Sequence, residues 1–236
     1  MPKVYSWLKK LHFCGFPPTC LLCGAAGEGD RDLCAGCAAD LPLNSPACYC
    51  CAIPLAGGTE LLCGRCQQQP PHFSQAFVPL LYQPPVDFLI KALKFQGRLT
   101  VARLLGDWLS EALADRSNPL PQAIIPVPLH AARMRERGFN QALEIARPIA
   151  RRLGIPMLPN AVSRIRHTAP QMGLDARTRR SNIHGAFIVS QPIQLQHVAI
   201  LDDVVTTAST VAEIAKVLRT AGVQEITIWA CARTPH

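Results

Sequence analysis

Two adjacent carboxylates, Asp202 and Asp203, follow an apolar run and precede a hydroxyl-rich turn. The apolar residues 198–201 predict a buried parallel strand, and residues 211–219 predict the helix that follows the turn. Ligands of open α/β sheets bind outside the carboxyl ends of strands, and a turn with N–H groups, hydroxyls and a helix N-terminus favours a phosphate. The carboxylates suit sugar hydroxyls or a hydrated Mg²⁺. A Thr/Ser N-cap alone, common in α/β proteins, does not explain two like charges side by side.

Eight of the eleven cysteines form four Cys-x-x-Cys pairs, with ten, ten and eleven residues between successive pairs. Each pair places two thiolates on one tight knuckle, and two knuckles complete a tetrahedral Cys₄ zinc site. Such sites leave no open position, so they predict two structural zinc ions. A disulfide framework suits small secreted chains instead, and a redox Cys-x-x-Cys would occur singly. The predicted zinc ligands are Cys20, Cys23, Cys34, Cys37, Cys48, Cys51, Cys63 and Cys66.

The spacing favours sequential pairing of the knuckles, 20/23 with 34/37 and 48/51 with 63/66. The near-equal gaps leave crossed and nested pairings open. Cys50 could replace Cys48 or Cys51, although only the latter two keep the two-residue spacing. Cys14 and Cys231 remain as spare thiols, and Cys231 is expected in the core because it lies in an apolar strand. A segment so short and poor in aliphatic residues needs metal for much of its folding energy.

A second candidate loop follows the strand predicted at 123–127. Prolines shape the end of that strand, and arginines suited to a polyphosphate come next. Three of these arginines stand at i, i+2 and i+4, so they cannot share one helical face. The alternative is a solvated Arg-rich helix start capped by Asn140. The candidate residues of this loop are Pro126, Val127, Pro128, Arg133 and Arg137.

The stretch from Arg164 to Phe187 is polar, lacks apolar periodicity and carries five arginines. A structureless stretch of that length inside a compact domain is usually functional or disordered. The candidate residues within it are Arg164, Thr168, Gln171, Arg177, Arg180 and Asn182.

The elements that must position these residues alternate between strands and helices. Strands are predicted at 76–82, 123–127, 157–162, 186–189, 198–201 and 225–231, and helices at 85–95, 99–114, 139–153 and 211–219. In the helix at 85–95, the apolar face is assigned to Phe88, Leu89, Ala92, Leu93 and Phe95, with Lys91 and Lys94 off that face. Alternation of this kind predicts a mostly parallel sheet flanked by helices. The linker at 67–71 divides a cysteine-rich module, 1–72, from an α/β domain, 73–236.

The composition bounds the class of protein. The 236 residues are 49% hydrophobic, no apolar run is long enough to span a bilayer, and the start lacks the order of a secretory signal. A cytoplasmic location is therefore expected. Residues 130–180 hold eleven arginines against three acidic residues, which accounts for the whole net charge of +8. Such a field attracts phosphate-rich polyanions, unless it is only a solvated basic surface.

These motifs together carry a resemblance to a known family. Residues 198–210 resemble the PRPP-binding signature of type I phosphoribosyltransferases. The order of four Cys-x-x-Cys pairs, then Pro-Val-Pro with Arg-Gly-Phe-Asn-Gln, then the Arg/Thr/Gln series, then Asp-Asp-Val-Val-Thr-Thr resembles the ComF/GntX family. That family consists of competence-associated, type I phosphoribosyltransferase-like proteins with an N-terminal double zinc ribbon. The resemblance covers nearly the whole chain and implies the type I phosphoribosyltransferase fold after the zinc-ribbon module.

The resemblance also implies roles for the candidate residues. The loop of Pro126 to Arg137 would hold pyrophosphate, and the stretch after Arg164 would form a lid that closes on PRPP. The family usually has Gly where this chain has Ala208, a position where Gly permits a positive φ and close approach of a ligand. We expect Ala208 to affect affinity more than fold. The PRPP-binding residues implied are Asp202, Asp203, Val204, Thr206, Thr207, Ala208, Ser209 and Thr210.

Two functions follow as expectations. The first is a phosphoribosyltransferase that binds PRPP with Mg²⁺, transfers the phosphoribosyl group to an acceptor and acts in natural competence or the use of extracellular DNA. The alternative is a non-catalytic factor that binds single-stranded DNA, a competence helicase or other competence proteins and uses PRPP as a sensor ligand. The aromatic content of 6% offers few base-stacking platforms, so DNA binding would be driven mainly by phosphates.

Overall fold

The computed structural model describes residues 17–57, 61–116, 119–166 and 183–235. Its main sheet is parallel throughout, in the order β1-β7-β6-β3, and β2 also pairs with β7. The strands are β1 (Gln75–Phe77), β2 (Leu80–Leu81), β3 (Ala123–Pro126), β6 (His197–Val205) and β7 (Glu225–Arg233). The central strands β6 and β7 are buried along most of their length because helices cover both faces of a parallel sheet.

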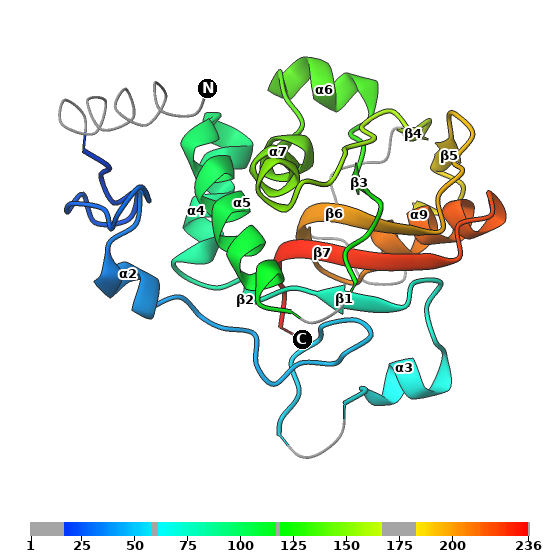
Figure 1. Cartoon of the computed structure of the whole chain (residues 1–236), viewed down its shortest axis with the longest axis horizontal. Helices are drawn as coiled ribbons and strands as arrows, with labels where there is room; N and C mark the ends of the chain where they lie inside the picture. The colour runs from blue at the N-terminus through cyan, green and yellow to red at the C-terminus, as the bar shows by residue number, and fades with distance from the viewer. Residues whose placement is uncertain (1–16, 58–60, 117–118, 167–182, 236) are drawn as a thin grey trace.

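Three helices cover one face of the sheet and a fourth covers the other (Figure 1). The first three are α4 (Val86–Gln96), α5 (Leu99–Ala114) and α7 (Gln141–Leu153), and the fourth is α9 (Ser209–Thr220). Right-handed crossovers explain this division. Helix α9 connects β6 to β7, on one side of β6, whereas α7 follows β3 and leads to Met157, which forms a parallel bridge with Ile124 on the other side. The two crossovers run in opposite directions along the sheet, so their helices lie on opposite faces. Helices α5 and α7 pack closely: a Cβ on Gly106 would lie 2.3 Å from Cγ of Pro148.

A separate two-stranded antiparallel sheet stands apart from the main one. It consists of β4 (Val162–Arg164) and β5 (Phe187–Val189), with Ser163 opposite Ile188. The predicted strand at 157–162 is therefore wrong in position. Met157 makes only an isolated bridge, and the regular strand begins at Val162. The predicted strand at 76–82 is also split, because β1 and β2 are separate short strands that pair with different parts of β7.

The cysteine-rich module has little regular structure, and much of it consists of the turns that carry the Cys-x-x-Cys pairs. Its helices are α2 (Ala35–Ala39) and α3 (Gly64–Gln68), one turn or so each. Asn44, 8% exposed, ties the module internally and to the sheet: its Nδ2 donates to Ala52 O at 2.9 Å and to Val78 O at 2.8 Å. An antiparallel bridge between Leu43 and Leu80 adds a second attachment. The module thus lies against the end of the sheet where β2 and β7 finish.

The helices confirm much of the expected periodicity, with two corrections. The helix at 99–114 has the predicted bounds. In α4, however, Phe88 and Phe95 are 49% and 66% exposed, so they are not part of its buried face. The Arg-rich segment after β3 is a helix, α6 (Ala131–Arg137), where a loop was predicted. His130 caps its start, with Nδ1 accepting from Ala132 N, and Gly138 ends it at φ 81°.

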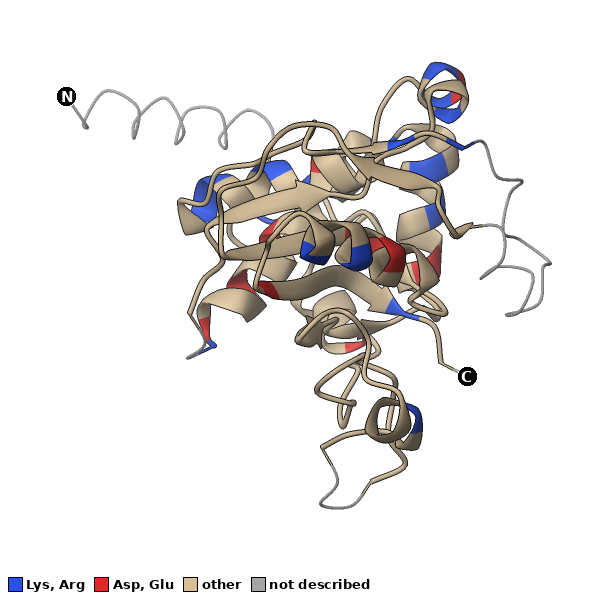
Figure 2. Ribbon diagram, turned by 90° about the vertical axis from the view of Figure 1, so that its right-hand side faces the viewer, with Lys and Arg blue, Asp and Glu red and all other residues tan. Residues whose placement is uncertain are grey.

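The expected fold class is confirmed: a mostly parallel sheet flanked by helices, with a small cysteine-rich module before it. Figure 2 shows Lys and Arg gathered on α6 and its surroundings, while the module that carries α3 is mostly uncharged. Among the described residues, no helix combines the length and apolar character that crossing a membrane requires.

Candidate functional site

The acidic pair lies in a step between two strands of the main sheet. Strand β3 stops pairing with β6 at Pro126, opposite Leu201, where Val127 N donates to Leu201 O at 2.8 Å. On its other side β6 continues to pair with β7 as far as Val205. Asp202 and Asp203 therefore lie within β6, beyond the end of β3 on one side and beside β7 on the other. The prediction that the strand ends at residue 201 holds for the β3 side only.

Asp203 is buried and paired with a lysine from α4. Its Oδ2 forms an ion pair with Lys94 Nζ at 2.6 Å, and the residue is only 3% exposed. Burial alone would lower the pKa of Lys94, but the Asp203 carboxylate raises it above the ordinary value. Removal of either partner leaves an uncompensated buried charge, which typically costs about 3–5 kcal/mol. Lys94 was predicted to lie off the packed face of α4, so the structure corrects its placement and adds it to the site.

Asp202 differs from its neighbour in its charge state. Burial, followed by the adjacent Asp203 carboxylate, raises the pKa of Asp202 to about 8. Its Oδ1 accepts a hydrogen bond from Asp203 N at 2.9 Å, which fixes the side chain across the strand. At neutral pH the raised pKa of Asp202 therefore favours its protonated form, beside the ion pair of Asp203 with Lys94.

The hydroxyl-rich turn connects β6 to α9 in a strained form. Thr207 Oγ1 and Ser209 Oγ are 2.7 Å apart, and Ser209 N donates to Thr207 Oγ1 at 3.4 Å. Ala208 caps α9 with φ 61° and ψ 8°, the left-handed region that favours Gly. The turn therefore keeps the conformation of a Gly-containing turn although Ala occupies the critical position. The helix N-terminus that follows provides the positive end of a dipole for an anion.

Ala208→Gly is expected to raise the free energy of unfolding by about 0.5 kcal/mol, because relief of left-handed strain exceeds the added entropy of the unfolded chain. A several-fold gain in affinity for a bound phosphate is expected as well. Ala212→Gly, inside α9, is the matched control and is expected to cost about 1 kcal/mol. Urea denaturation measures both. Equal destabilisation by the two substitutions would contradict the strain assigned to Ala208.

Arginines of α6 and β4 lie within electrostatic reach of the acidic pair. Arg137 is half-buried, and burial lowers its pKa while the Asp203 charge opposes that shift. Burial also lowers the pKa of Arg164, with a further contribution from Arg133 and an opposing one from Asp202. Charge interactions of this strength require the three arginines and the two aspartates to lie near one another. The structure thus brings together one arginine of the predicted lid segment and both arginines of the predicted pyrophosphate segment.

The segment between β3 and α7 is held in place by side-chain bonds. Asn140 caps α7 by accepting from Ala142 N at 3.0 Å, and its Nδ2 donates to Val127 O at 3.0 Å. Arg137 Nη1 donates to Gln141 Oε1 at 2.5 Å.

The guanidinium of Arg164 lies 5.6 Å from the centre of the Phe187 ring. The other lid residues predicted from the sequence lie outside the described residues: Thr168, Gln171, Arg177, Arg180 and Asn182.

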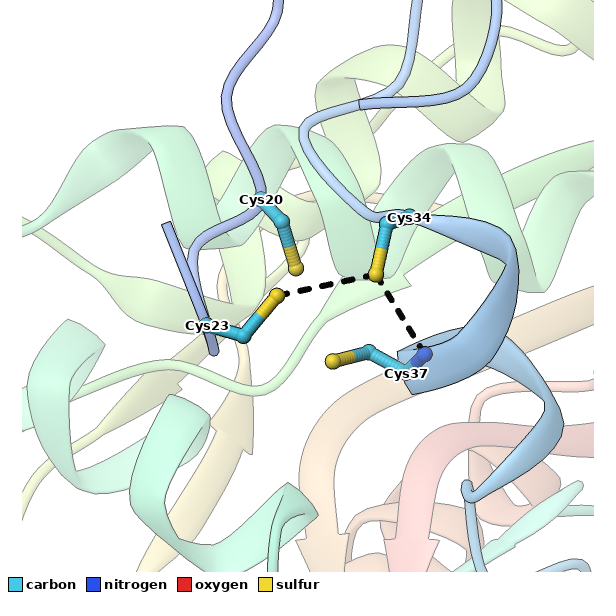
Figure 3. A group of neighbouring side chains, drawn as sticks. All are labelled: Cys20, Cys23, Cys34 and Cys37. Carbon is cyan, nitrogen blue, oxygen red and sulfur yellow. Dashed lines mark hydrogen bonds between the residues drawn. The ribbon is translucent and has the colours of Figure 1, made fainter. Parts of the chain in front are cut away.

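Eight cysteines form two groups with the sequentially paired knuckles predicted from their spacing. One group holds Cys20, Cys23, Cys34 and Cys37, whose sulfur atoms point toward one another in Figure 3. The other group holds Cys48, Cys51, Cys63 and Cys66. In each group the four sulfur atoms lie within 4.8 Å of one another. The sulfur atoms of Cys23 and Cys34 are 3.6 Å apart and those of Cys51 and Cys63 are 3.7 Å apart, near the roughly 3.8 Å that a tetrahedral zinc site with Zn–S bonds of about 2.3 Å requires.

The thiols of the two groups have pKa shifts in both directions: burial raises the pKa of Cys51 to about 11, whereas the first thiol of each group is shifted downward. Burial raises the pKa of Cys20, but N–H groups of Cys34 and Cys23 outweigh it and lower the pKa to about 6. Burial is likewise outweighed at Cys48, where backbone N–H groups lower the pKa to about 7. The residue after each first knuckle has a positive φ, 77° at Gly24 and 55° at Ala52, so both knuckles share one backbone form. The two Cys₄ groups fit two structural zinc ions.

The remaining described cysteines are outside the four-sulfur groups. Cys231, 1% exposed, lies in the core of β7, as expected. Cys50 is buried near the second group, and burial raises its pKa. Cys48 and Cys51 are the knuckle members, so the substitution of either by Cys50, left open by the sequence, does not occur.

One residue that contacts the hydroxyl-rich turn gave no signal in the sequence. Arg233, at the end of β7, is 3% exposed and donates to the backbone of the hydroxyl-rich turn. A single arginine at a strand end has no periodicity or spacing by which it could be recognised. Lys94, in contrast, had a weak signal: a lysine next to buried apolar positions on a helix that precedes the site.

Comparisons with known proteins match both halves of the chain. The family model described as a double zinc ribbon domain matches residues 14–67. DNA utilization protein YhgH of Salmonella typhi is 39% identical over 206 residues, which cover 86% of this chain and 90% of that protein. Competence protein F of Haemophilus influenzae is 38% identical over 222 residues, covering 91% and 96%. YhgH of Escherichia coli K12 is 38% identical over 223 residues, covering 92% and 98%.

Solved structures show looser similarities. Glutamine phosphoribosylpyrophosphate amidotransferase from B. subtilis, complexed with ADP and GMP, aligns with a TM-score of 0.38 and 16% identity over 60% of this chain and 30% of that chain. Purine phosphoribosyltransferase from Pyrococcus horikoshii aligns with a TM-score of 0.32 and 16% identity, covering 55% of this chain and 79% of that chain.

Proposed function

The chain belongs to the family of competence protein F and DNA utilization protein YhgH, and from that premise we propose that it is a PRPP-binding phosphoribosyltransferase-like protein. It acts in natural competence or the utilisation of extracellular DNA, in the cytoplasm, and transfers the phosphoribosyl group to an acceptor in a Mg²⁺-dependent reaction. The α/β domain, residues 73–236, performs this step, and the module of residues 1–72 carries the two zinc ions.

The acidic pair beside a left-handed turn is the observation that carries the proposal. Asp202 and Asp203 occupy the step beyond β3, and the turn that follows opens α9 with φ 61° at Ala208. A ribose and its 5-phosphate need these groups in this order: carboxylates for vicinal hydroxyls, then N–H groups, hydroxyls and a helix N-terminus for the phosphate. The proposal rests on this combination, because each part alone is common in α/β proteins.

The residues divide the work of phosphoribosyl transfer among them. Asp202 and Asp203 accept hydrogen bonds from the ribose hydroxyls, and residues 206–210 bind the 5-phosphate. Arg133 and Arg137 attract the pyrophosphate, whose charge grows as its bond to the anomeric carbon breaks. Bound Mg²⁺ would neutralise part of that charge. Lys94 places a cation beside Asp203 and so reduces the repulsion that arises when Asp202 also loses its proton.

The raised pKa of Asp202 predicts that PRPP binding releases a proton. Because the pKa of Asp202 is about 8, its carboxyl group keeps the proton in the folded chain at lower pH, whereas ribose hydroxyls are held best by the carboxylate. Affinity for PRPP with Mg²⁺ is therefore expected to rise from pH 6 to pH 8 and then to level off. Calorimetry in two buffers with different ionisation enthalpies measures the release. Heats that do not depend on the buffer would contradict it. Asp87→Asn, in the first turn of α4, is expected to leave the proton release unchanged.

The same pKa shift has a consequence for stability. The folded chain holds a proton on Asp202 between the ordinary pKa of 3.8 and about 8, while the unfolded chain has lost it. Over that window the folded state binds more protons than the unfolded state, so Asp202 makes stability fall as pH rises. Asp202 thus lowers the stability of the fold at neutral pH. A residue of this kind is expected where ligand binding, and not folding, requires it.

A second candidate function is supported by the relatives' names and by the arginines around the site. The chain would then bind single-stranded DNA, a competence helicase or another competence protein and use PRPP as a sensor. Release of pyrophosphate from PRPP and Mg²⁺ is the experiment that separates the two. Release that is faster than in a chain-free control supports the transferase. PRPP binding with no release, even with nucleobases, nucleosides and oligonucleotides as acceptors, favours the sensor. DNA affinity would then fall steeply with salt.

A further inference from the structure

Arg233 joins two parts of the chain that are far apart in sequence. Its Nε donates to Cys51 O at 3.2 Å, in the knuckle of the second Cys₄ group. Its Nη1 donates to Val205 O at 3.1 Å and also to Thr206 O, at the start of the hydroxyl-rich turn. Figure 1 shows the end of β7 lying beside the part of the module that leads to α3. One guanidinium therefore bridges a metal-type knuckle and the predicted phosphate-binding turn.

The surroundings of Arg233 explain why an arginine is needed. The residue is 3% exposed, and burial lowers the pKa of its guanidinium although the group stays charged. Buried carbonyl groups without donors are costly, and Arg has five N–H donors in a planar fork. Lys offers three donors from a single atom, so it cannot reach carbonyls on opposite sides at once. Charge-assisted bonds of this kind make the bridge stiff.

The first Cys₄ group is connected differently. Residues next to it form ion pairs with α5, where Arg31 Nη2 lies 2.7 Å from Glu111 Oε2 and Arg103 pairs with Asp32. These contacts lie on a helix that covers the sheet, away from the turn at 206–210. The first group therefore provides an internal control for the second, because each consists of four cysteines and the second knuckle of each opens a short helix.

We propose that Arg233 is a positioning residue through which the second metal site holds the phosphate-binding turn in its binding conformation. Metal on Cys48, Cys51, Cys63 and Cys66 fixes the knuckle and with it the Cys51 carbonyl. Arg233 takes its orientation from that carbonyl and fixes the carbonyls of Val205 and Thr206, and so the turn that follows. The inference rests on the proposed function only for the identity of the ligand, since the bridge itself joins residues of the chain.

Hydrogen exchange in the ligand-free full chain tests the bridge. The first variant is Arg233→Lys, and the second replaces Cys63 and Cys66 together with Ser, with Cys34 and Cys37 replaced by Ser as the matched control. Exchange of the amides at 206–210 is expected to become about 10-fold faster in the first two and to stay unchanged in the control. Amides at 198–201 are expected to keep their protection in all three, which excludes general unfolding. Arg233→Lys is expected to retain two zinc ions per chain.

Binding of PRPP with Mg²⁺ gives the second readout. Arg233→Lys and the Cys63/Cys66 variant are expected to bind PRPP about 10-fold more weakly, whereas the Cys34/Cys37 variant binds like the parent chain. Equal effects of the two cysteine variants, or an unchanged turn in Arg233→Lys, would overturn the proposal. If the parent chain does not bind PRPP, the proposed function fails, but the hydrogen-exchange result still decides whether the bridge exists.

Discussion

Replacement of both Asp202 and Asp203 by Asn is expected to weaken PRPP binding by about 100-fold or more. Each carboxylate accepts charge-assisted hydrogen bonds that contribute roughly 1.5–3 kcal/mol, and every 1.4 kcal/mol corresponds to about a tenfold change in affinity. Asn keeps the size of the side chain and removes the charge. Calorimetry with PRPP and Mg²⁺ measures the loss directly.

This double variant needs a control for the charge it leaves behind. Lys94 would face no carboxylate, and a buried unpaired ammonium destabilises the fold. Addition of Lys94→Met removes the cation together with its partner, and the triple variant is expected to regain stability without regaining PRPP binding. Asp87→Asn, which removes a partly buried carboxylate paired with Lys91, is expected to bind PRPP normally. Binding that survives in the triple variant would show that the site lies elsewhere.

Removal of both zinc ions is expected to unfold the cysteine-rich module. Structural zinc contributes roughly 10–16 kcal/mol of binding free energy in small folded units, and this module has only two very short helices in its described part. A chelator with a thiol reagent should release two ions per chain, one for each Cys₄ group. Hydrogen exchange would show loss of protection at 17–57 while β6 keeps most of its own.

Two thiols outside the Cys₄ groups provide the controls for metal content. Cys50→Ala and Cys231→Ala are expected to retain both ions, because neither sulfur belongs to a four-sulfur group. Cys231→Ala is expected to lower stability modestly, as removal of a buried sulfur leaves a small cavity. A metal-free chain that keeps its module protected, or a metal content other than two, would contradict the structural role assigned to zinc.

Local patterns were enough to predict many of the elements. The helix at 99–114 was predicted with its observed bounds because its apolar residues repeat at helical spacing and face the core. The apolar run before the acidic pair, the turn and the helix after it gave the β6–α9 unit for the same reason. The positive φ of Ala208 also agrees with the preference for Gly at that position, which is a local property of the backbone.

Features set by distant parts of the chain were not predictable. The spacing of the cysteine pairs favoured the sequential pairing that the structure shows, but it left crossed and nested pairings open, and the fold decides which knuckles meet. Lys94 is partly buried because its ammonium group reaches a carboxylate on a distant strand, whereas the larger apolar residues Phe88 and Phe95 of the same helix face outward. Helix α6 buries none of its residues, so it has no apolar stripe to reveal it, and its caps form it instead. Arg233 gains its role only from the meeting of two segments.

Calorimetry of the unmodified chain with PRPP and Mg²⁺ is the most direct test of the account. The acidic pair, the left-handed turn and the arginines of α6 predict saturable binding of one PRPP per chain, with proton release below pH 8. The affinity should fall when Mg²⁺ is omitted. Absence of binding at ligand concentrations up to about 1 mM, the upper end of ordinary substrate affinities, would contradict the assignment of this site to PRPP.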